Sequence, residues 1–507
     1  MSALPIGEAS APRELRDYQA QAIELLRASL LAGHRRPVLQ APTAMGKTVI
    51  ASHIVRMAIE KDKRVVFCVP ALSLIDQTLE SFWRDGITDI GVIQGSHVDT
   101  DWSRPVQVAS VQTLARRNYP TAHLVIVDEC HRSYKIIETW IKDPAWSRVP
   151  FIGLSATPWT RGLGQYYDEL IIAQTTQQLI DAGYLSNFRV FAPSHPDLSG
   201  VKIQAGDYHE GQLSEVMSKQ ALVADVVETW IKRGEGRPTL CFGVDCAHAK
   251  HLQARFQEAG IDAAYQDAVT SSSDRAQIKR DFHSGRLPMV CNIGTLTTGV
   301  DWDVRCIILA RPTRSEILYV QIVGRGLRTA EGKDYCLILD HSDSTQKLGF
   351  VTDIHHDRLD DGRVRQEKKA QAPLPKECPE CTYLMPPRTT ICPMCGHERR
   401  PPVRNVATSD GELVELSRDG RTPLKRGREK SGSIELRGRS IPLEQFFGEL
   451  KAYAALHRYK SGWAANQYRA AIGVWPNAHR WAPEIPASME TISWIRSRQI
   501  AWARRRG

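Results

Sequence analysis

Short apolar runs alternate with helical patterns over residues 35–345, and this alternation limits the possible fold more than any other feature. Runs that are rich in Val and Ile and bounded by turn residues predict buried strands at RPVLQA, RVVFCVP, VQVAS, LVIVDE and FIGLSA. The same rhythm returns with PTLCFG, PMVCNIG, VRCIILA and DYCLILD. Strands that alternate with amphipathic crossover segments such as SLIDQTLESFW predict parallel sheets. We therefore expect an α/β protein with two sheet domains in tandem.

The expected domain boundaries follow from where this rhythm pauses and stops. The chain has 507 residues, which is too many for one ordinary core. A polar stretch separates the two series, and a charged, proline-containing stretch that suits a linker follows the second. Five tryptophans near the C-terminus favour a packed domain there. The expected segments are a first sheet domain (1–195), a linker (196–220), a second sheet domain (221–345), a linker (346–375), a small cysteine-rich segment (376–400), a basic linker (401–440) and a mostly helical domain (441–507).

Composition narrows the class of protein. The formal net charge is +9, which favours a polyanionic partner. No apolar run of about 18 residues occurs, so we expect no membrane span. The first residues lack a basic patch followed by an apolar stretch, so we expect no secretory signal. An odd number of cysteines, 11, argues against a disulfide scaffold and fits a cytoplasmic location.

The stretch APTAMGKT (41–48) lies between a strand pattern, PVLQ, and a helical pattern, VIASHIVRMAI. This context is typical of a phosphate-binding loop in which Ala41 replaces the leading glycine. Backbone amides and the dipole at a helix N-terminus favour anions there. The residues expected to bind nucleotide are Pro42, Thr43, Ala44, Met45, Gly46, Lys47 and Thr48. Lys47 would reach the β- and γ-phosphates, and Thr48 would hold Mg²⁺. The alternative is a strand–turn–helix with a chance Gly-Lys-Thr.

The stretch LVIVDECHRS (124–133) places two acids at the end of a predicted strand. Asp128 would hold Mg²⁺, and Glu129 would orient and deprotonate the attacking water. One alternative is an acidic strand end that faces solvent. A zinc site at Cys130 and His131 is less favoured, because adjacent strand residues point to opposite faces. Together with the loop at 41–48, the pattern favours an ATP-driven motor.

The motifs of this chain, and the order in which they occur, resemble those of superfamily 2 helicases of the DEAD/DEAH-box kind. The four-residue box that gives this group its name reads Asp-Glu-Cys-His in this chain. The resemblance covers about 13–345 and implies two RecA-like domains, ATP and Mg²⁺ as cofactors, and nucleic acid as partner. The motifs that carry it are LRDYQ (15–19), VPALSLIDQ (69–77), VASVQTL (108–114), LSATP (154–158), TTGVD (297–301) and QIVGRGLR (321–328). One departure is VCNIG, which lacks the expected Thr or Ser before TTGVD.

The resemblance also implies individual roles. Arg16 and Gln19 would contact adenine, and Gly299 and Asp301 would contact nucleotide and nucleic acid. Ser155 and Thr157 would couple hydrolysis to domain movement, and His131 would couple the nucleotide site to the second domain through Gln321. The residues expected to share one helix face are Gln321, Arg325 and Arg328. These arginines would reach across the cleft and stabilise the charge that develops on the γ-phosphate.

The cysteine-rich segment reads CPECTYLMPPRTTICPMCGHE and contains two Cys-x-x-Cys pairs. Four thiolates close a tetrahedral zinc site, so this spacing predicts structural Zn²⁺. The expected ligands are Cys378, Cys381, Cys392 and Cys395. The segment could bind nucleic acid, contact a partner or brace the motor, and nearby arginines (Arg388, Arg399, Arg400 and Arg404) slightly favour nucleic acid.

The C-terminal region combines basic runs (425–430 and 503–507) with aromatic residues. Tyr459, Trp463, Tyr468 and Trp475 could stack on bases, although we expect most of them in a core. With the cysteine segment and GWAANQYRAAIGVWP included, the chain resembles the RadD-like bacterial and phage branch. That resemblance implies a DNA helicase or translocase in repair or recombination, associated with the nucleoid and with single-strand-binding protein. The alternatives are an RNA helicase, the motor subunit of a restriction or phage system, and a non-catalytic adaptor.

Overall fold

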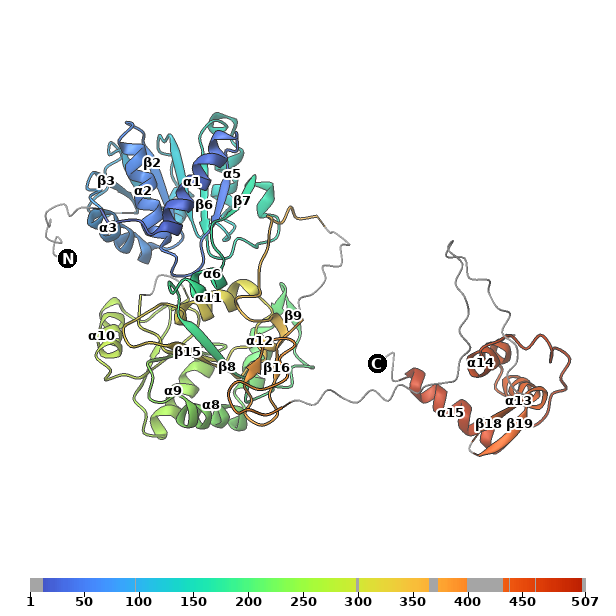
Figure 1. The fold of residues 1–507 in the computed structure, drawn as a ribbon. Helices are drawn as coiled ribbons and strands as arrows, with labels where there is room; N and C mark the ends of the chain where they lie inside the picture. Colours follow the sequence, from blue (N-terminus) through green and yellow to red (C-terminus); the bar gives the residue numbers. More distant parts are fainter. Residues whose placement is uncertain are drawn as a thin grey trace. The chain divides into compact units, whose positions relative to one another are not determined.

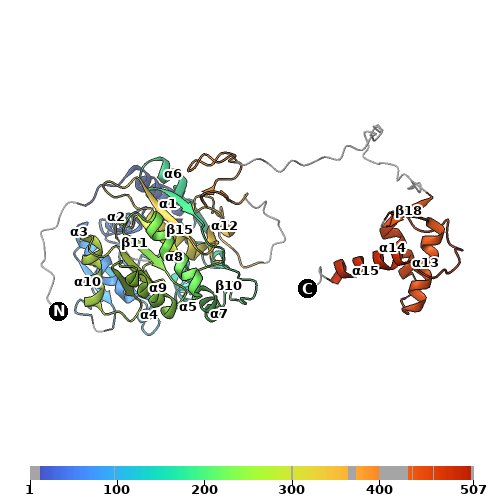
Figure 2. The same ribbon diagram turned by 90° about the horizontal axis from the view of Figure 1, so that it is seen from below.

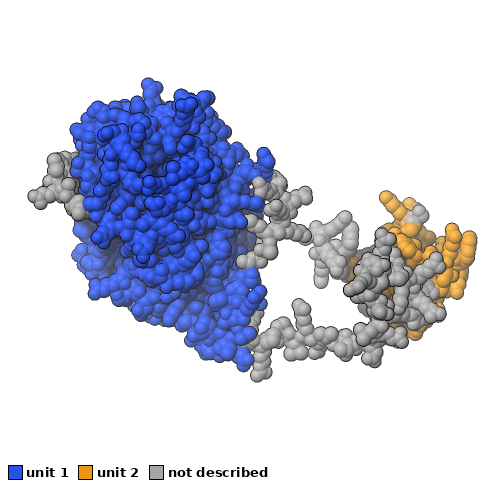
Figure 3. Space-filling model, turned by 45° about the horizontal axis from the view of Figure 1, so that its top comes forward, with its two compact units in different colours: residues 1–402 blue, residues 403–507 orange. Residues whose placement is uncertain are grey.

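The computed structural model describes residues 12–95, 97–297, 301–363, 373–398, 432–436, 438–460 and 462–503. It forms two compact units, 1–402 and 403–507, which are coloured separately in Figure 3. Each unit is treated by itself. The described residues of unit 1 contain two large sheets, which form the two lobes seen in Figure 1, and the cysteine-rich segment.

The first lobe is built on a parallel sheet with seven strands in the described residues. They are β1 (Pro37–Gln40), β2 (Val65–Val69), β3 (Ile90–Ile93), β4 (Val106–Ser110), β5 (Leu124–Asp128), β6 (Phe151–Ser155) and β7 (Glu169–Ile172). Their order is β3-β4-β2-β5-β6-β1-β7. Its helices are α1 (Asp17–Leu31), α2 (Lys47–Ile59), α3 (Ile75–Arg84), α4 (Val111–Leu114), α5 (Lys135–Lys142) and α6 (Thr176–Asp181). Apolar cores on both faces explain why the strands are continuous apolar runs.

The second lobe is built on a parallel sheet with six strands in the described residues. They are β8 (Asn187–Phe191), β11 (Thr239–Phe242), β12 (Ala263–Gln266), β13 (Met289–Asn292), β14 (Cys306–Leu309) and β15 (Tyr335–Asp340), in the order β12-β13-β11-β14-β15-β8. Its helices are α7 (Glu210–Met217), α8 (Gln220–Arg233), α9 (Cys246–Glu258), α10 (Ser272–His283), α11 (Glu316–Gly326) and α12 (Ser344–Leu348). Two RecA-like parallel sheets in tandem are thus confirmed.

The chain enters the second sheet earlier than expected. β8 lies within the segment 1–195 that we assigned to the first lobe, yet it pairs with β15 in the second sheet. The expected boundary at residue 195 is therefore too late. The segment 196–220 also holds more structure than a linker, namely the hairpin β9 (Ile203–Gln204) and β10 (Asp207–Tyr208) and the helix α7.

A segment that follows α12 returns from the second lobe to the first, and we call residues 349–363 the strap. The Asp360 carbonyl accepts a hydrogen bond from the Gly164 amide at 2.8 Å, and the Asp360 carboxylate accepts one from the Gly162 amide at 3.0 Å. Within the strap, the His356 ring stacks on Trp159 of the first lobe with centroids 4.8 Å apart. The same imidazole pairs with Glu316 of α11 at 2.7 Å. The strap therefore contacts both lobes.

The cysteine-rich segment, described over 373–398, packs on the edge of the second sheet. It contains the strands β16 (Lys376–Glu377) and β17 (Leu384–Met385). The Ala192 amide, just after β8, donates to the Thr382 carbonyl at 3.0 Å, and the rings of Phe191 and Tyr383 meet edge to face. His195 lies between Asp343 and Glu377, at 2.6 and 2.9 Å. These contacts lie along the edge strand β8 and favour bracing among the three roles considered for the segment.

Unit 2 is a small body of helices and a hairpin (Figure 2). It has its own hydrophobic core. It begins with the hairpin β18 (Ser433–Leu436) and β19 (Arg439–Pro442), followed by α13 (Leu443–Leu456), α14 (Trp463–Ile472) and α15 (Met489–Ala503). The expected helical C-terminal region is confirmed, with a hairpin in addition. Tyr468 is buried as expected, whereas Tyr459 and Trp475 are exposed, so the expectation of core positions is wrong for these two.

Within the described parts of both units, no helix combines the length and apolar character needed to cross a bilayer.

Candidate nucleotide site

The phosphate-binding loop connects β1 to α2 through an unusual backbone path. Ala44 and Gly46 both have positive φ, at 70° and 88°. A Cβ on Gly46 would lie 2.4 Å from Nε2 of Gln19, so both conformation and space require glycine there. The Met45 amide closes the turn on the Pro42 carbonyl at 2.9 Å. The loop thus leads into the first turn of α2, whose free amides suit a phosphate.

The two residues predicted to contact adenine lie beside this loop. Gln19 is buried, and its Nε2 donates to the Met45 carbonyl at 2.9 Å. Its Oε1 accepts from the Arg16 amide at 3.0 Å. The Arg16 guanidinium lies over the Tyr184 ring, 5.2 Å from the centroid. The structure therefore places Gln19 at the loop, with Arg16 joined to it through a hydrogen bond to Gln19, and contact of either residue with the base stays a prediction.

Lys47 is paired with the two acids at the end of β5. Its Nζ forms an ion pair with Glu129 and lies 3.8 Å from Asp128. Glu129 has a positive φ of 48°, which turns its side chain back toward the loop. The predicted lysine and both carboxylates therefore converge at one point, where a γ-phosphate and Mg²⁺ would lie between them. Thr43 also fits a nucleotide site, because its buried Oγ1 has no hydrogen-bond partner among the described residues.

Burial and charge shift the protonation of this group. Burial lowers the pKa of Lys47, but the attraction of Glu129 and Asp128 outweighs it, so the pKa lies above its ordinary value. Burial raises the pKa of Asp128 to about 6, against the opposing effect of Lys47. Burial also acts to raise the pKa of Glu129, yet Lys47 and His131 hold it below its ordinary value. Glu129 is therefore ionised at neutral pH, and Asp128, with a pKa of about 6, is mostly ionised there as well.

A chain of polar contacts links this site to the second lobe. His131 Nδ1 lies 2.9 Å from Oγ of Ser155, which also accepts from the Thr157 amide at 3.0 Å. On the other side of the ring, Nε2 lies 3.2 Å from Nε2 of Gln321 in α11. Gln321 also donates to Oγ1 of Thr157 at 3.3 Å. The Gln321 amide thus contacts both His131 and Thr157 of the first lobe.

Helix α11 packs directly against the phosphate-binding loop. A Cβ on Gly324 would lie 2.7 Å from Cβ of Thr43, so glycine permits this approach. The next residue, Arg325, is buried, and its guanidinium is near enough to Glu129 for mutual attraction. Burial lowers the pKa of Arg325 to about 10, which leaves it charged at neutral pH. Arg325 therefore occupies the position expected of an arginine that completes the site.

Arg328 departs from the expected helix face. Helix α11 ends at Gly326, so Arg328 lies beyond it and does not continue the face of Gln321 and Arg325. Its guanidinium forms an ion pair with Asp301. A direct role for Arg328 at the phosphates stays a prediction. Gly299, the other residue predicted from TTGVD, lies outside the described residues, as do Arg399, Arg400 and Arg404.

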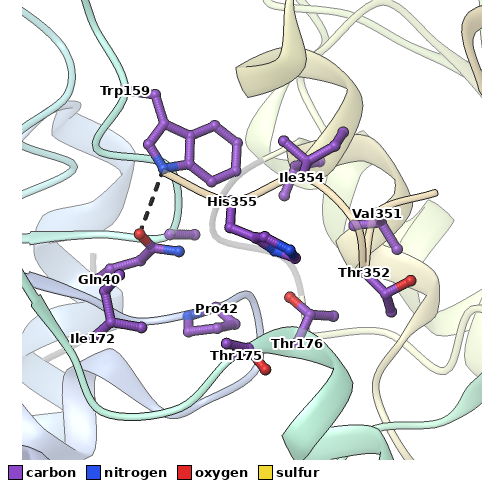
Figure 4. A pocket seen from close by; sticks show the side chains of 12 residues that line it. Gln40, Pro42, Trp159, Ile172, Thr175, Thr176, Val351, Thr352, Ile354 and His355 are labelled. Carbon is purple, nitrogen blue, oxygen red and sulfur yellow. Dashed lines mark hydrogen bonds between the residues drawn. The ribbon is translucent and has the colours of Figure 1, made fainter. Parts of the chain in front are cut away.

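A recess between the lobes lies next to the loop but is separate from the catalytic groups. It is lined by first-lobe residues, including Gln40, Pro42 and Trp159, and by strap residues, including His355 (Figure 4). The Trp159 indole donates to Gln40 at 3.4 Å. Neither Lys47 nor the two acids line it, so we assign it no nucleotide.

The four predicted zinc ligands come together. The Sγ atoms of Cys378, Cys381, Cys392 and Cys395 all lie within 4.8 Å of one another. The pairs Cys378–Cys395 and Cys381–Cys392 are 3.6 Å apart. Four thiolates about 2.3 Å from a tetrahedral zinc would be about 3.8 Å apart, so this donor set fits Zn²⁺.

Sequence reasoning missed two parts of the site. Gly324 could have been noticed as a glycine inside a helical pattern, which indicates close packing. The strap gave no usable signal, because its apolar residues, among them the buried Phe350 and Val351, follow neither a helix nor a strand period.

Two family models match the chain. "Type III restriction enzyme, res subunit" matches residues 13–160, and "Helicase conserved C-terminal domain" matches residues 219–330. These ranges cover the loop and both acids in the first lobe, and all of α11 in the second.

Individual proteins match over much of the chain. A "51.5 kDa protein" of a Lactococcus phage is 30% identical over 71% of this chain and 78% of its own length. "Putative ATP-dependent helicase IRC3" of Saccharomyces cerevisiae is 32% identical over 64% of this chain, which spans 51% of that protein. A solved fragment of "a putative HsdR subunit of a type I restriction enzyme" from Vibrio vulnificus is 23% identical, with a TM-score of 0.52 over 68% of this chain and 67% of the fragment. That structure supports the fold alone.

Proposed function

This chain belongs to the ATP-dependent helicases of superfamily 2, and we propose that it is a motor that couples ATP hydrolysis to movement along DNA. The observation that carries the proposal is the junction between the lobes. Lys47, Asp128 and Glu129 converge on the first lobe, and Arg325 reaches the same point from the second. Such a site is complete only when the lobes are together, so hydrolysis can drive their separation.

The proposed chemistry assigns one task to each group. The loop amides and Lys47 hold the phosphates in line with the attacking water. Thr48 and Asp128 would hold Mg²⁺, which neutralises charge on the β- and γ-phosphate oxygens. Glu129 takes the proton of the water whose oxygen attacks the γ-phosphorus, while the bond to the β–γ bridging oxygen breaks. Arg325 stabilises the charge that develops, in a buried setting where such an interaction is strong.

Movement would follow from the loss of the γ-phosphate. His131 lies next to Glu129 at 3.3 Å and contacts Gln321 on the other lobe. A shift of Glu129 after hydrolysis therefore alters a contact that joins the lobes. Ser155 and Thr157 hold the other ends of the same chain of contacts. We propose these as the coupling residues.

We propose DNA as the strand on which the motor acts. The positive net charge suits a phosphate backbone, and the family model that matches the first lobe carries the name of a restriction enzyme, a class that acts on DNA. RNA is the runner-up, because such motors grip mainly the backbone. A motor subunit of a restriction or phage system is a further candidate, on the matches described above. From the RadD-like resemblance we propose repair or recombination as the setting, near the nucleoid and with single-strand-binding protein as a partner.

An ATPase assay over a panel of nucleic acids tests the proposal. Single-stranded DNA, branched DNA and RNA are added in turn to the full chain, and DNA is expected to stimulate turnover most. Lys47→Ala is expected to abolish turnover, because it removes the charge that contacts the phosphates. Lys63→Ala, an exposed lysine of the same lobe, is the matched control and is expected to behave as wild type. Near wild-type turnover by Lys47→Ala would refute the assignment of the site.

A further inference from the structure

We propose that unit 2 carries a separate binding surface for single-stranded nucleic acid, built from three tryptophan–arginine pairs. This deepens the proposed function and rests on it, because it adds a second contact to the strand on which the motor acts. The pairs are Trp475 with Arg469, Trp481 with Arg480, and Trp494 with Arg498. We call these six residues the tryptophan–arginine surface.

The loop between α14 and α15 holds two of the tryptophans outward. Pro476 and Ala482 are buried, and Nζ of Lys451 in α13 donates to the Ala482 carbonyl at 2.7 Å. These anchors fix both ends of the turn. Trp475 is nevertheless 44% exposed and Trp481 is 88% exposed. An indole left this open forgoes the free energy of burial, which for a large aromatic side chain is among the largest available.

Each tryptophan has a guanidinium over its ring. The distance from the guanidinium carbon to the ring centroid is 4.6 Å for Arg469 on Trp475 and 5.6 Å for Arg480 on Trp481. The third pair lies beside the first, because Nη2 of Arg498 donates to the Ala470 carbonyl at 3.2 Å, next to Arg469. The surface therefore presents flat apolar rings and fixed positive charges together.

Charge favours a polyanion as the occupant. Residues 432–507 contain 12 Lys and Arg against 5 Asp and Glu. Over residues 466–489, which carry the loop, Glu484 is the single acid in the sequence. An acidic backbone with flat rings attached matches this combination, since bases stack on indoles while phosphates contact arginines. In a duplex the bases are already stacked, so an unpaired strand fits better than a paired one.

The test uses the full chain and a fluorescent oligo-dT, without nucleotide. Trp475→Ala combined with Trp481→Ala is expected to weaken binding about tenfold or more, because each lost base–indole stack weakens binding measurably. The concentration of DNA that half-stimulates the ATPase is expected to rise by a similar factor, while kcat at saturating DNA stays unchanged. Phe at both positions is expected to retain most of the affinity, and duplex DNA is expected to be affected much less. Oligo-rU is expected to show the same loss, since stacking does not read the 2′-hydroxyl.

Leu456→Ala is the matched control, because Leu456 is a 79% exposed apolar residue of the same unit that lies outside the surface. If DNA stimulates the wild-type ATPase and the double alanine variant keeps wild-type affinity, the surface does not bind the strand and the motor assignment stands. An equal loss for duplex DNA would also overturn stacking as the mode of contact. If no nucleic acid stimulates the wild-type chain, the proposed function itself fails.

Discussion

The contact between His131 and Gln321 gives a quantitative test of how the two lobes communicate. Gln321→Ala removes two hydrogen bonds, to His131 at 3.2 Å and to Thr157 at 3.3 Å. Both are at the long end of the usual range, so each is worth about 1 kcal/mol. Losing both costs about 2 kcal/mol, which lowers kcat about 30-fold if the contacts are made in the transition state. KM for ATP is expected to stay near its wild-type value, because Gln321 is not part of the phosphate-binding loop.

A double-mutant cycle isolates the pairwise energy. His131→Ala and Gln321→Ala are measured singly and together by steady-state ATPase at saturating DNA. The double variant is expected to be about fivefold faster than the two single effects multiplied together, which corresponds to a coupling of about 1 kcal/mol. Gln257→Ala, a glutamine of α9 that donates to the Ala263 carbonyl away from the cleft, is the control. Strictly multiplicative effects would show that the contact does not transmit hydrolysis.

Three further predictions concern packing, metal and pH. Gly324→Ala places a methyl group 2.7 Å from Cβ of Thr43. We therefore expect overpacking to cost about 1–3 kcal/mol when the cleft between the lobes closes. This cost is expected to lower kcat and to change the thermal midpoint of either lobe little. Metal analysis is expected to find about one zinc per chain, and chelation is expected to lower the thermal midpoint, because the segment that packs on β8 loses its metal. The control variant Cys246→Ser, outside the cluster, should bind zinc normally. An unchanged midpoint on chelation would contradict the bracing role. Burial lowers the pKa of His248 from 6.5 to about 4, and its Nδ1 accepts from the Val244 amide at 3.2 Å. The unfolded chain therefore binds the proton first, so stability is lost as pH falls below 6.5, by about 2 kcal/mol at pH 5. Urea unfolding of His248→Gln should show a smaller loss than wild type over that range.

Local patterns allowed the core of the motor to be predicted. The strand runs, the loop at 41–48 and the acids at 128 and 129 depend on periodicity and short-range spacing, which one sequence carries in full. The four cysteines were equally readable, because a tetrahedral site needs only two pairs with the right separation. The structure brings each of these groups together as expected.

Features that depend on contacts between residues far apart in the sequence could not be predicted from local patterns. Nothing in NFRVF says which sheet β8 joins, because strand pattern does not identify the partner. The place of Arg328 depended on where α11 ends, and one extra turn of helix would have put it on the predicted face. The exposure of Trp475 was also hidden, since an indole in a helical region is equally compatible with core or surface.

The strap is the second segment that connects the two lobes. The two points where these connecting segments contact α11 define an axis. The first connecting segment, between α6 and β8, contacts the C-terminal end of α11, where the Ser186 amide donates to the Leu327 carbonyl at 2.7 Å. The second meets its N-terminal end through His356 and Glu316. A helix of 11 residues separates these points by about 16 Å.

Two bodies joined at two points rotate most freely about the line between them, and that line runs along α11. We therefore expect the lobes to turn about this line when they separate. Gln321 and Arg325 of α11 would move only far enough to lose their contacts with the first lobe, and the outer strands β3 and β12 would be displaced further.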